Sequence, residues 1–296
     1  MNLNVKATNL SLQYKEFEAL KDVSFSLEQG KIYGLIGRNG AGKTTLLSIL
    51  SSFMERSSGT LEIGGEDPFE NRRIMPHVNF VYETDYSEEY EPIKRYFDFA
   101  ERYRLTFDRE YAKDLAARFK LPLDKPIKKL SSGMQSALNV TIGLASRSPI
   151  TIFDESYRGM DAPTRELFYK EVLEEQARHP RIMILSTHLV SEMDYLFDHV
   201  LILDRGALLV DEPYDEIISR GASITGEANN VDQFVNGMNQ LSRKQLGSTK
   251  SVMVYGELTE KEVRLAEELG LEIGPVSLQE LFIHLTEEEG HHENKQ

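Results

Sequence analysis

Hydrophobic and polar residues alternate along the first 36 positions, as they do in β-strands that have one buried face. This alternation covers Leu10–Tyr14 and Val23–Leu27. A fully apolar run, Ile32–Ile36, follows and predicts a buried strand. Apolar residues at helical spacing then extend from Thr44 to Leu50, and further short strands are predicted at Leu61–Ile63 and His77–Tyr82.

Helical periodicity replaces this alternation between residues 84 and 147. Two stripes of residues have helical spacing: Tyr96, Phe99 and Tyr103, and then Tyr111, Leu115 and Phe119. Most aromatic residues of this block are expected to form its core, although side chains that line a docking surface would show the same spacing. We predict a helical subdomain over about residues 84–147.

Strands and helices alternate again from residue 150 to residue 211. Apolar runs predict four strands and two helices, the strands at Ile150–Phe153, Ile182–Leu185, Val200–Leu203 and Ala207–Val210 and the helices at Thr164–Arg178 and Val190–Leu196. Strands that alternate with helices form parallel sheets that are covered on both faces. We therefore expect residues 1–220 to be an α/β domain, with the helical subdomain inserted between two halves of its sheet.

The pattern of hydrophobic and polar residues changes again at residue 221, and residues 221–296 are expected to form a small α+β domain. The segment Ser223–Asn230 is small and polar, which predicts a linker. Beyond it, a helix with Val231, Phe234, Met238 and Leu241, a strand at Val252–Tyr255 and helices at Val263–Leu269 and Leu278–Leu285 are predicted. The charged end, Glu287–Gln296, is expected to be frayed, and its pair His291-His292 to be solvated rather than metal-binding.

Composition narrows the classes of protein that fit. The 296 residues are 40% hydrophobic, which is enough for one large or two smaller cores, and the absence of cysteine excludes disulfides and thiolate metal sites. A net charge of −14 opposes long-range attraction to nucleic acid or anionic lipid. Neither a secretory signal at Met1–Leu12 nor a run of roughly 18 apolar residues is present, so we expect any membrane role to need a partner.

The stretch Gly37-Arg38-Asn39-Gly40-Ala41-Gly42-Lys43-Thr44 fits the phosphate-binding pattern G-x-x-x-x-G-K-[ST] at every fixed position. Glycines there let backbone N–H groups approach phosphate oxygens closely. Lys43 supplies a cation for the β- and γ-phosphates, and the Thr44 hydroxyl is suited to Mg²⁺. The helix that opens at Thr44 and Thr45 directs its positive end at the anion. The sequence therefore predicts a nucleoside triphosphate site.

Three further stretches add candidate chemistry. The apolar strand Ile150–Phe153 ends in Asp154 and Glu155, where an aspartate can hold the Mg²⁺ shell and a glutamate can polarise the attacking water. In Leu130-Ser131-Ser132-Gly133-Met134-Gln135, Ser131 is a helix N-cap candidate and the short side chains leave the helix N-terminus open to an anion. His188 ends the strand that begins at Ile182.

These motifs, in this order and spacing, resemble the ATP-binding subunits of ABC transporters, whose signature L-S-G-G-Q occupies the place of L-S-S-G-M here. The resemblance implies a P-loop NTPase fold of the ABC type with a RecA-like sheet, and a head-to-tail dimer that encloses two ATP molecules. It also implies a role for each matched residue: adenine stacking for Tyr14, a switch role for His188, the dimer-crossing loop for Gly159-Met160-Asp161, and contact with the opposite subunit's ATP for Ser131 and Gly133.

The chain departs from the family pattern at four positions. Ser132 replaces a signature glycine, Met134 replaces the signature glutamine, and Ser156 stands where proline usually follows the glutamate. Glu83 falls where many members have the glutamine of the Q-loop, and its carboxylate could ligate Mg²⁺. The stretch Gly274–Phe282 is similar to the tail of ATPases that serve ABC-2 type exporters, which implies export of a drug-like compound, a peptide or a polysaccharide.

The resemblance implies an ATPase that energises an exporter, with ATP and Mg²⁺ as cofactors. Its expected partners are a separate transmembrane permease and a second ATP-binding subunit, identical or different, and its expected place is cytoplasmic, on the inner face of the cell membrane. The alternative is a soluble ABC-type ATPase that acts on ribosomes or nucleic acid; such proteins usually carry two cassettes or a long coiled coil, and neither is present in this sequence. The signature stretch disfavours a small-molecule kinase.

Overall fold

A computed structural model describes residues 3–286, and the chain in it divides into two compact units. The first unit comprises Met1–His188 and Tyr195–Asp211, and the second comprises Leu189–Asp194 and Glu212–Gln296. The boundary expected after residue 220 therefore falls inside the second unit. The tail Glu287–Gln296, with the pair His291-His292, lies outside the described residues.

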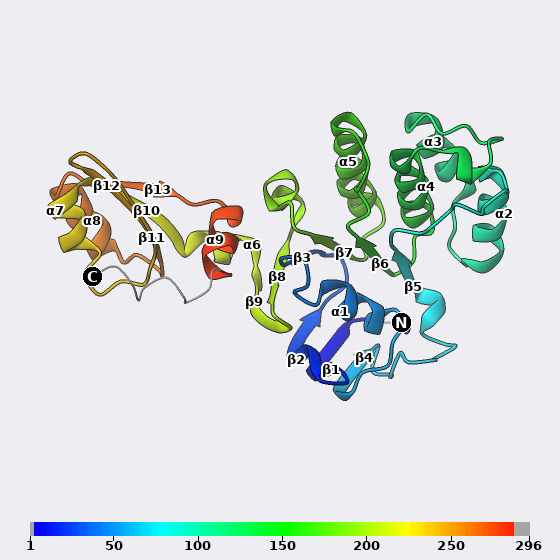
Figure 1. Ribbon diagram of the computed structural model, residues 1–296, viewed down its shortest axis with the longest axis horizontal. Helices are drawn as coiled ribbons and strands as arrows, with labels where there is room; N and C mark the ends of the chain where they lie inside the picture. Colours follow the sequence, from blue (N-terminus) through cyan, green and yellow to red (C-terminus); the bar gives the residue numbers. More distant parts are fainter. Residues whose placement is uncertain (1–2, 287–296) are drawn as a thin grey trace. The chain divides into compact units, whose positions relative to one another are not determined.

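A six-stranded sheet forms the centre of the first unit (Figure 1). Its order is β5-β6-β7-β3-β8-β9, with bounds Val78–Val81, Ile150–Asp154, Ile182–Thr187, Ile32–Ile36, His199–Asp204 and Ala207–Pro213. The pairs from β5 to β8 are parallel, as the alternation of strands and helices predicts. Every residue of β3 and of β7 is buried, which explains why these strands are continuous apolar runs.

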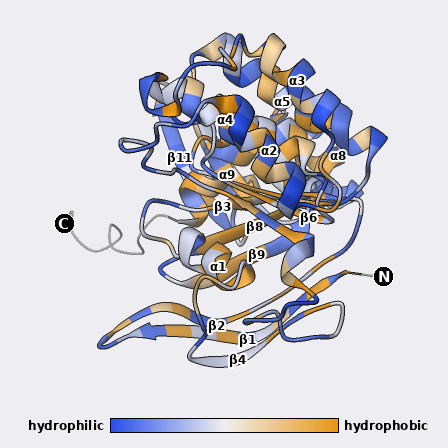
Figure 2. Ribbon diagram, turned by 90° about the vertical axis from the view of Figure 1, so that its right-hand side faces the viewer, coloured by the Kyte–Doolittle hydropathy of each residue, from blue (hydrophilic) through white to orange (hydrophobic). Residues whose placement is uncertain are grey.

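A three-stranded antiparallel sheet of order β2-β1-β4 forms a second layer, with bounds Phe17–Leu27, Val5–Tyr14 and Ser58–Ile63. Figure 2 shows hydrophobic and hydrophilic residues alternating along these strands. Hydrophobic residues such as Leu10, Leu20 and Val23 are buried. Helix α1, Lys43–Leu50, buries Leu46, Leu47 and Leu50 in the same core cluster. Helix α1, which follows the phosphate-binding loop, therefore packs in the core shared by the two sheets.

Three helices form the inserted block, α2 at Ile93–Tyr103, α3 at Arg109–Arg118 and α4 at Ser132–Ala145 (Figure 1). The predicted stripe on α3 is confirmed, because Tyr111, Leu115 and Phe119 are buried. The stripe predicted on α2 is wrong: Phe99 and Tyr103 are exposed, and the buried face carries Ile93, Phe97 and Ala100. The side chains on this buried face are on average smaller than those of the predicted stripe, Tyr96, Phe99 and Tyr103.

The long helix α5, Ala162–Arg178, follows β6 as the sequence predicts. A regular helix does not form at Val190–Leu196, where two short 3₁₀ turns at Val190–Glu192 and Asp194–Leu196 replace it. None of the helices within residues 3–286 is long and apolar enough to cross a membrane.

The second unit contains helix α6 (Tyr214–Ser219), then the order strand, helix, strand, strand, helix, strand, and finally α9 (Leu278–Leu285). The elements of this βαββαβ arrangement are β10 Gly221–Glu227, α7 Ala228–Phe234, β11 Gln240–Leu246, β12 Thr249–Tyr255, α8 Glu260–Glu268 and β13 Glu272–Pro275. Its sheet has the order β11-β12-β10-β13, and each neighbouring pair is antiparallel.

The linker predicted at Ser223–Asn230 is therefore wrong. Its first half belongs to β10, a central strand of the sheet, and its second half begins α7. Ala222 and Ile224 are buried against the helices, while Ser223 and Thr225 on the other face bond the Ser251 hydroxyl. Cross-strand pairing thus gives strand structure to a segment whose small residues resemble a loop.

Candidate nucleotide-binding site

The loop between β3 and α1 has a backbone that only glycine permits at its key positions. Gly42 caps α1 with a φ of 107° in the left-handed region, and a Cβ there would lie 2.8 Å from the Ala19 carbonyl oxygen. A Cβ at Gly37 would lie 2.6 Å from the Leu203 carbonyl oxygen. These contacts leave no room for a side chain at Gly37 or Gly42, so the backbone there can approach an anion directly.

Lys43 is the first residue of α1, and its ammonium group is turned back into the loop. The Nζ atom donates to the carbonyl oxygens of Gly37 at 2.6 Å and Arg38 at 3.3 Å, and it lies 3.5 Å from Glu155 Oε1. Burial lowers the pKa of Lys43, and the charge of Glu155 opposes this effect. A buried cation at the mouth of a helix N-terminus is a group that can bind phosphate.

Thr44 and Asp154 meet although they lie far apart in the sequence. The Thr44 hydroxyl donates to Asp154 Oδ2 at 2.8 Å, and the Ser186 hydroxyl donates to the other oxygen of Asp154. Such hard oxygen ligands fit Mg²⁺, which is commonly held by one or two protein groups together with substrate phosphates. Residues 3–286 contain no group of three or more histidine or acidic residues able to hold a metal ion.

Glu155 follows β6 with a φ of 44°, a left-handed conformation that is costly for a residue with a side chain. Its amide donates to Ser186 Oγ at 3.2 Å. Its Oε1 atom lies 3.1 Å from His188 Nδ1, and its Oε2 atom forms an ion pair with Arg158. Burial raises the pKa of this carboxyl group, but the hydrogen bond with His188 and the nearby cations outweigh burial, so that the pKa is lowered.

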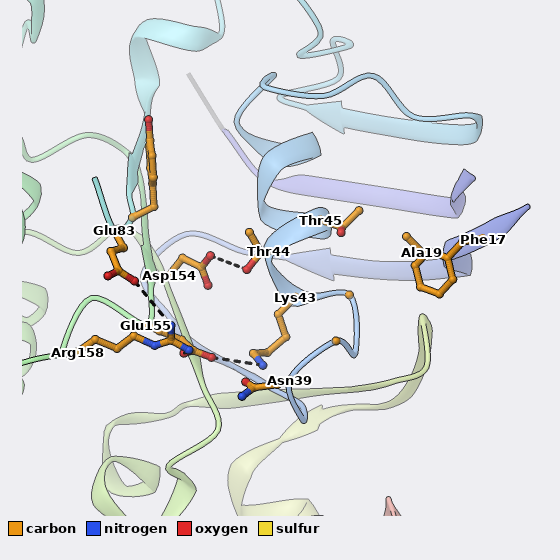
Figure 3. Close-up of a pocket in the computed structure, with 13 residues that line it drawn as sticks. Phe17, Ala19, Asn39, Lys43, Thr44, Thr45, Glu83, Asp154, Glu155 and Arg158 are labelled. Atoms are coloured by element: carbon orange, nitrogen blue, oxygen red, sulfur yellow. Dashed lines mark hydrogen bonds and ion pairs between the residues drawn. The ribbon is translucent and has the colours of Figure 1, made fainter. Parts of the chain in front are cut away.

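A cavity of about 450 Å³ joins these groups (Figure 3). Its lining includes nine residues that the sequence singles out: Asn39, Gly40, Gly42, Lys43, Thr44, Thr45, Glu83, Asp154 and Glu155. The structure adds residues that sequence reasoning missed, namely Phe17, Ala19, Tyr82 and Arg158. Gly37 and His188 contact the site through Lys43 and Glu155 rather than through the cavity wall.

Tyr14 lies outside this lining, and its hydroxyl donates to Met54 Sδ at 2.6 Å. The aromatic residue in the cavity wall is Phe17, which is 63% exposed and pairs with Tyr14 across the turn between β1 and β2. A short hairpin tip with an aromatic residue on each strand was visible in the sequence, but its register was not.

The signature residues and Asp161 occupy a second hollow, of about 170 Å³. The Ser131 hydroxyl caps α4 by accepting from the Met134 amide at 3.3 Å, as the sequence predicts. Asp161 caps α5 by accepting from the Thr164 amide at 3.0 Å, and the hydrogen bonds from Thr164 lower the pKa of Asp161. Within one chain, therefore, these residues are not brought into the cavity that contains Lys43.

Gly133 and Gly159 fix the backbone between these two capped helices. A Cβ at Gly133 would overlap the Gly159 carbonyl oxygen, and Gly159 itself has a φ of 74°. The residue that replaces a signature glycine, Ser132, has its hydroxyl oxygen 2.8 Å from the place of a Cβ on Gly159. The extra side chain of Ser132 is therefore accommodated because its neighbour has none.

The site combines three features: a glycine loop with a buried lysine, a threonine beside an aspartate, and a strained glutamate. Together, on a mixed α/β sheet, they define a P-loop ATPase. The family model "ABC transporter" matches residues 20–158. The solved structure of an ATP-binding subunit of an ABC transporter has the same fold, with a TM-score of 0.65 and 24% identity over 72% of this chain and 91% of that one.

Three curated relatives extend this likeness. The Nod factor export ATP-binding protein I of Ralstonia nicotianae is 30% identical over 71% of this chain and 67% of its own. The ABC transporter ATP-binding protein YtrB of Bacillus subtilis is 27% identical over 90% of this chain and 92% of its own. The bacitracin transport ATP-binding protein BcrA of Bacillus licheniformis is 29% identical over 74% and 73%. The chain belongs to the ABC transporter family, and it is an ATP-binding, ATP-hydrolysing member.

Proposed function

We propose that this protein energises a membrane exporter by hydrolysing ATP. The observation that carries the proposal is the convergence of Lys43, the Thr44–Asp154 pair and Glu155 on one cavity. Export is supported by the name of one relative, which describes Nod factor export, and the name of another describes bacitracin transport. A drug-like compound, a peptide or a polysaccharide is the substrate class that these relatives and the segment Gly274–Phe282 favour.

In this proposal Lys43 binds the β- and γ-phosphates, and the backbone of the loop surrounds them. The loop residues concerned are Gly37, Asn39, Gly40, Gly42, Thr44 and Thr45. Thr44, Asp154 and Glu83 are the residues that would hold Mg²⁺. The metal ion supplies positive charge that offsets the charge developing on the phosphates.

Glu155 accepts a proton from the attacking water, and His188 orients its carboxylate. The hairpin tip supplies the surface on which adenine stacks: Phe17 lines the cavity, and Tyr14 is its neighbour on the opposite strand. Ser131, Gly133 and Asp161 serve the ATP bound to a second subunit, because in their own chain they lie outside the Lys43 cavity.

The permease contact is assigned to the aromatic groove between β5 and the inserted helices. This groove has a volume of about 200 Å³, and its aromatic lining is Phe80, Tyr82, Tyr86 and Tyr96. Tyr82 also lines the ATP cavity, so one side chain borders both sites. A short cytoplasmic helix of a separate permease would place the protein on the inner face of the cell membrane, with residues 221–296 as an accessory domain.

The test uses a tagged Glu155→Gln chain, which should bind ATP without turning it over and remain paired with its partners. It is purified from detergent-solubilised source cells with MgATP, and the proteins that accompany it are identified by mass spectrometry. The Lys43→Ala chain is the control that should bind ATP poorly. A multi-span membrane protein, with or without a second ATPase, supports the proposal; ribosomal or nucleic-acid-associated proteins without a membrane protein would refute it.

A further inference from the structure

Arg158 connects two carboxylates in the ATP cavity, and the proposed mechanism leaves this arginine unused. It lies on the loop between β6 and α5, three positions after Glu155. Its guanidinium group forms an ion pair with Glu155 Oε2 and lies 3.7 Å from Glu83 Oε2 (Figure 3). Its side chain is 47% exposed, whereas that of Glu155 is only 10% exposed. A half-exposed cation thus covers a nearly buried carboxylate.

Both oxygens of Glu155 are occupied in this arrangement. Oε1 faces Lys43 and His188, and Oε2 faces Arg158. A carboxylate can accept a proton from water only through an oxygen that the water can reach and whose lone pair is not committed to a cation. Binding of triphosphate gives Lys43 a stronger anionic partner, but it does not by itself release Oε2. Departure of Arg158 would free Oε2 for the attacking water.

Glu83 is placed to receive the arginine. Its carboxylate is 78% exposed and already within 4 Å of the guanidinium, so a change of rotamer transfers the ion pair without moving the backbone. The backbone of Arg158 is itself fastened to the signature helix α4, because its carbonyl accepts from the Ser136 hydroxyl at 2.7 Å. The arginine is thereby held at a fixed point between its two possible partners.

We propose that Arg158 is a positioning residue that masks Glu155 and unmasks it by moving to Glu83. This inference rests on the proposed role of Glu155 as the proton acceptor. It gives the glutamate at position 83 a function that glutamine could not perform as well, because a neutral amide is a weaker partner for a guanidinium group than a carboxylate. The pair would restrain ATP hydrolysis by the isolated protein.

The test measures steady-state ATP turnover of the purified full-length chain with Arg158→Ala, Glu83→Gln and the double variant. Arg158→Ala should raise kcat by roughly two- to fivefold, the range for breaking one half-exposed ion pair. Glu83→Gln should lower kcat by a similar factor, and this effect should be clearly smaller in the Arg158→Ala background. Arg158→Lys, which keeps the charge, should keep kcat closer to that of the unaltered chain than Arg158→Ala does.

A matched control is Arg178→Ala, which removes an arginine of similar exposure, 49%, that pairs with Glu174 at the end of α5 and lies outside the cavity lining. Its kcat should equal that of the unaltered chain. An unchanged or lower kcat in Arg158→Ala would overturn the inference. So would an equal loss from Glu83→Gln in both backgrounds, since Glu83 would then act on the metal ion or the substrate independently of the arginine.

A second readout does not depend on turnover. The dissociation constant of ATP, measured by calorimetry in EDTA, should change less than about twofold in Arg158→Ala, because the arginine binds protein carboxylates and not phosphate. A tenfold weakening would identify Arg158 as a phosphate ligand and refute the masking role. Glu155→Gln is assayed in parallel: if it keeps full turnover, the proposed role of Glu155 fails, whereas its inactivity together with an unaltered Arg158→Ala rate rejects only the masking.

Discussion

Substitution of Arg181 should destabilise the fold, and the contacts of this residue determine how large the loss of unfolding free energy should be. This arginine is 2% exposed at the entry to β7, and it donates to Glu175 Oε1 at 3.2 Å and to the Leu144 carbonyl oxygen at 3.2 Å. Glu175 is fully buried on α5 and is also bonded by Arg147 Nε at 2.9 Å. Burial lowers the pKa of Arg181, and the neighbouring carboxylate opposes that effect.

Substitution of Arg181 by methionine fills a similar volume but leaves Glu175 with a single cationic partner. Within the described residues, Glu175 Oε2 already lacks a hydrogen-bond partner, so the remaining charge would be poorly compensated. Breaking one side of a buried ion pair costs about 3–5 kcal/mol. For a unit of this size, each kcal/mol lowers Tm by about 2–4 °C, so a fall of roughly 10 °C is expected.

Differential scanning calorimetry of the full chain measures this effect, and urea unfolding followed by circular dichroism gives the free energy independently. The double variant Arg181→Met with Glu175→Leu removes both charges, so it should recover most of the loss. Arg178→Met, whose surface pair with Glu174 spans 2.6 Å, should cost less than about 0.5 kcal/mol. A loss below about 1 kcal/mol in Arg181→Met would show that the buried pair is hydrated or dispensable, and would refute the attribution of a 3–5 kcal/mol cost to an uncompensated Glu175 charge.

Three further changes have expected outcomes. Gly133→Ala should weaken ATP-dependent dimer formation by at least tenfold, seen by light scattering, because its Cβ overlaps a backbone carbonyl; unaltered dimers would contradict the packing. Phe17→Ala should weaken ATP binding roughly tenfold while Tyr14→Ala changes it little, and calorimetry showing the reverse would return adenine stacking to Tyr14. Asp67→Asn should cost about 0.5 kcal/mol at pH 7, because the hydrogen-bonded ion pair with Arg56 lowers the pKa of Asp67. The stability that this pair contributes is present above the ordinary aspartate pKa of about 3.9 and is lost as pH falls through the lowered value. Urea melts in which the two proteins differ equally at pH 3 and pH 7 would therefore exclude the ion pair as the source of the loss.

The phosphate-binding part of the site could be predicted because the residues that form it are consecutive in the sequence. Strand β3, the glycine loop and α1 follow one another directly, and β3 has the bounds that its apolar run predicts. The meeting of Thr44 with Asp154 was also predictable, since a metal-bound phosphate needs both oxygen ligands at one place. The requirement for two oxygen ligands at one metal ion thus predicted a contact between residues that lie far apart in the sequence.

Other features depend on tertiary packing that no short window contains. On α2, two apolar faces lie side by side, and only contact with the neighbouring helices selects the one with Phe97 over the one with Phe99. Strand β11 is a polar, exposed edge whose residues carry no alternation, so its strand structure comes from pairing with β12. The same holds for the small residues of β10.

The departures from the family pattern also become intelligible only in space. Ser156, in the place of a proline, is buried, and its hydroxyl donates to the Val81 carbonyl oxygen at 3.1 Å, which fastens the loop after β6 to β5. Glu83, in the place of a glutamine, lies beside Arg158. Ser156 and Glu83 thus each have a partner whose contact would be lost or weakened if the usual residue returned. Restoring the common glutamine alone should therefore impair this protein, because the neighbouring arginine would remain without its alternative carboxylate.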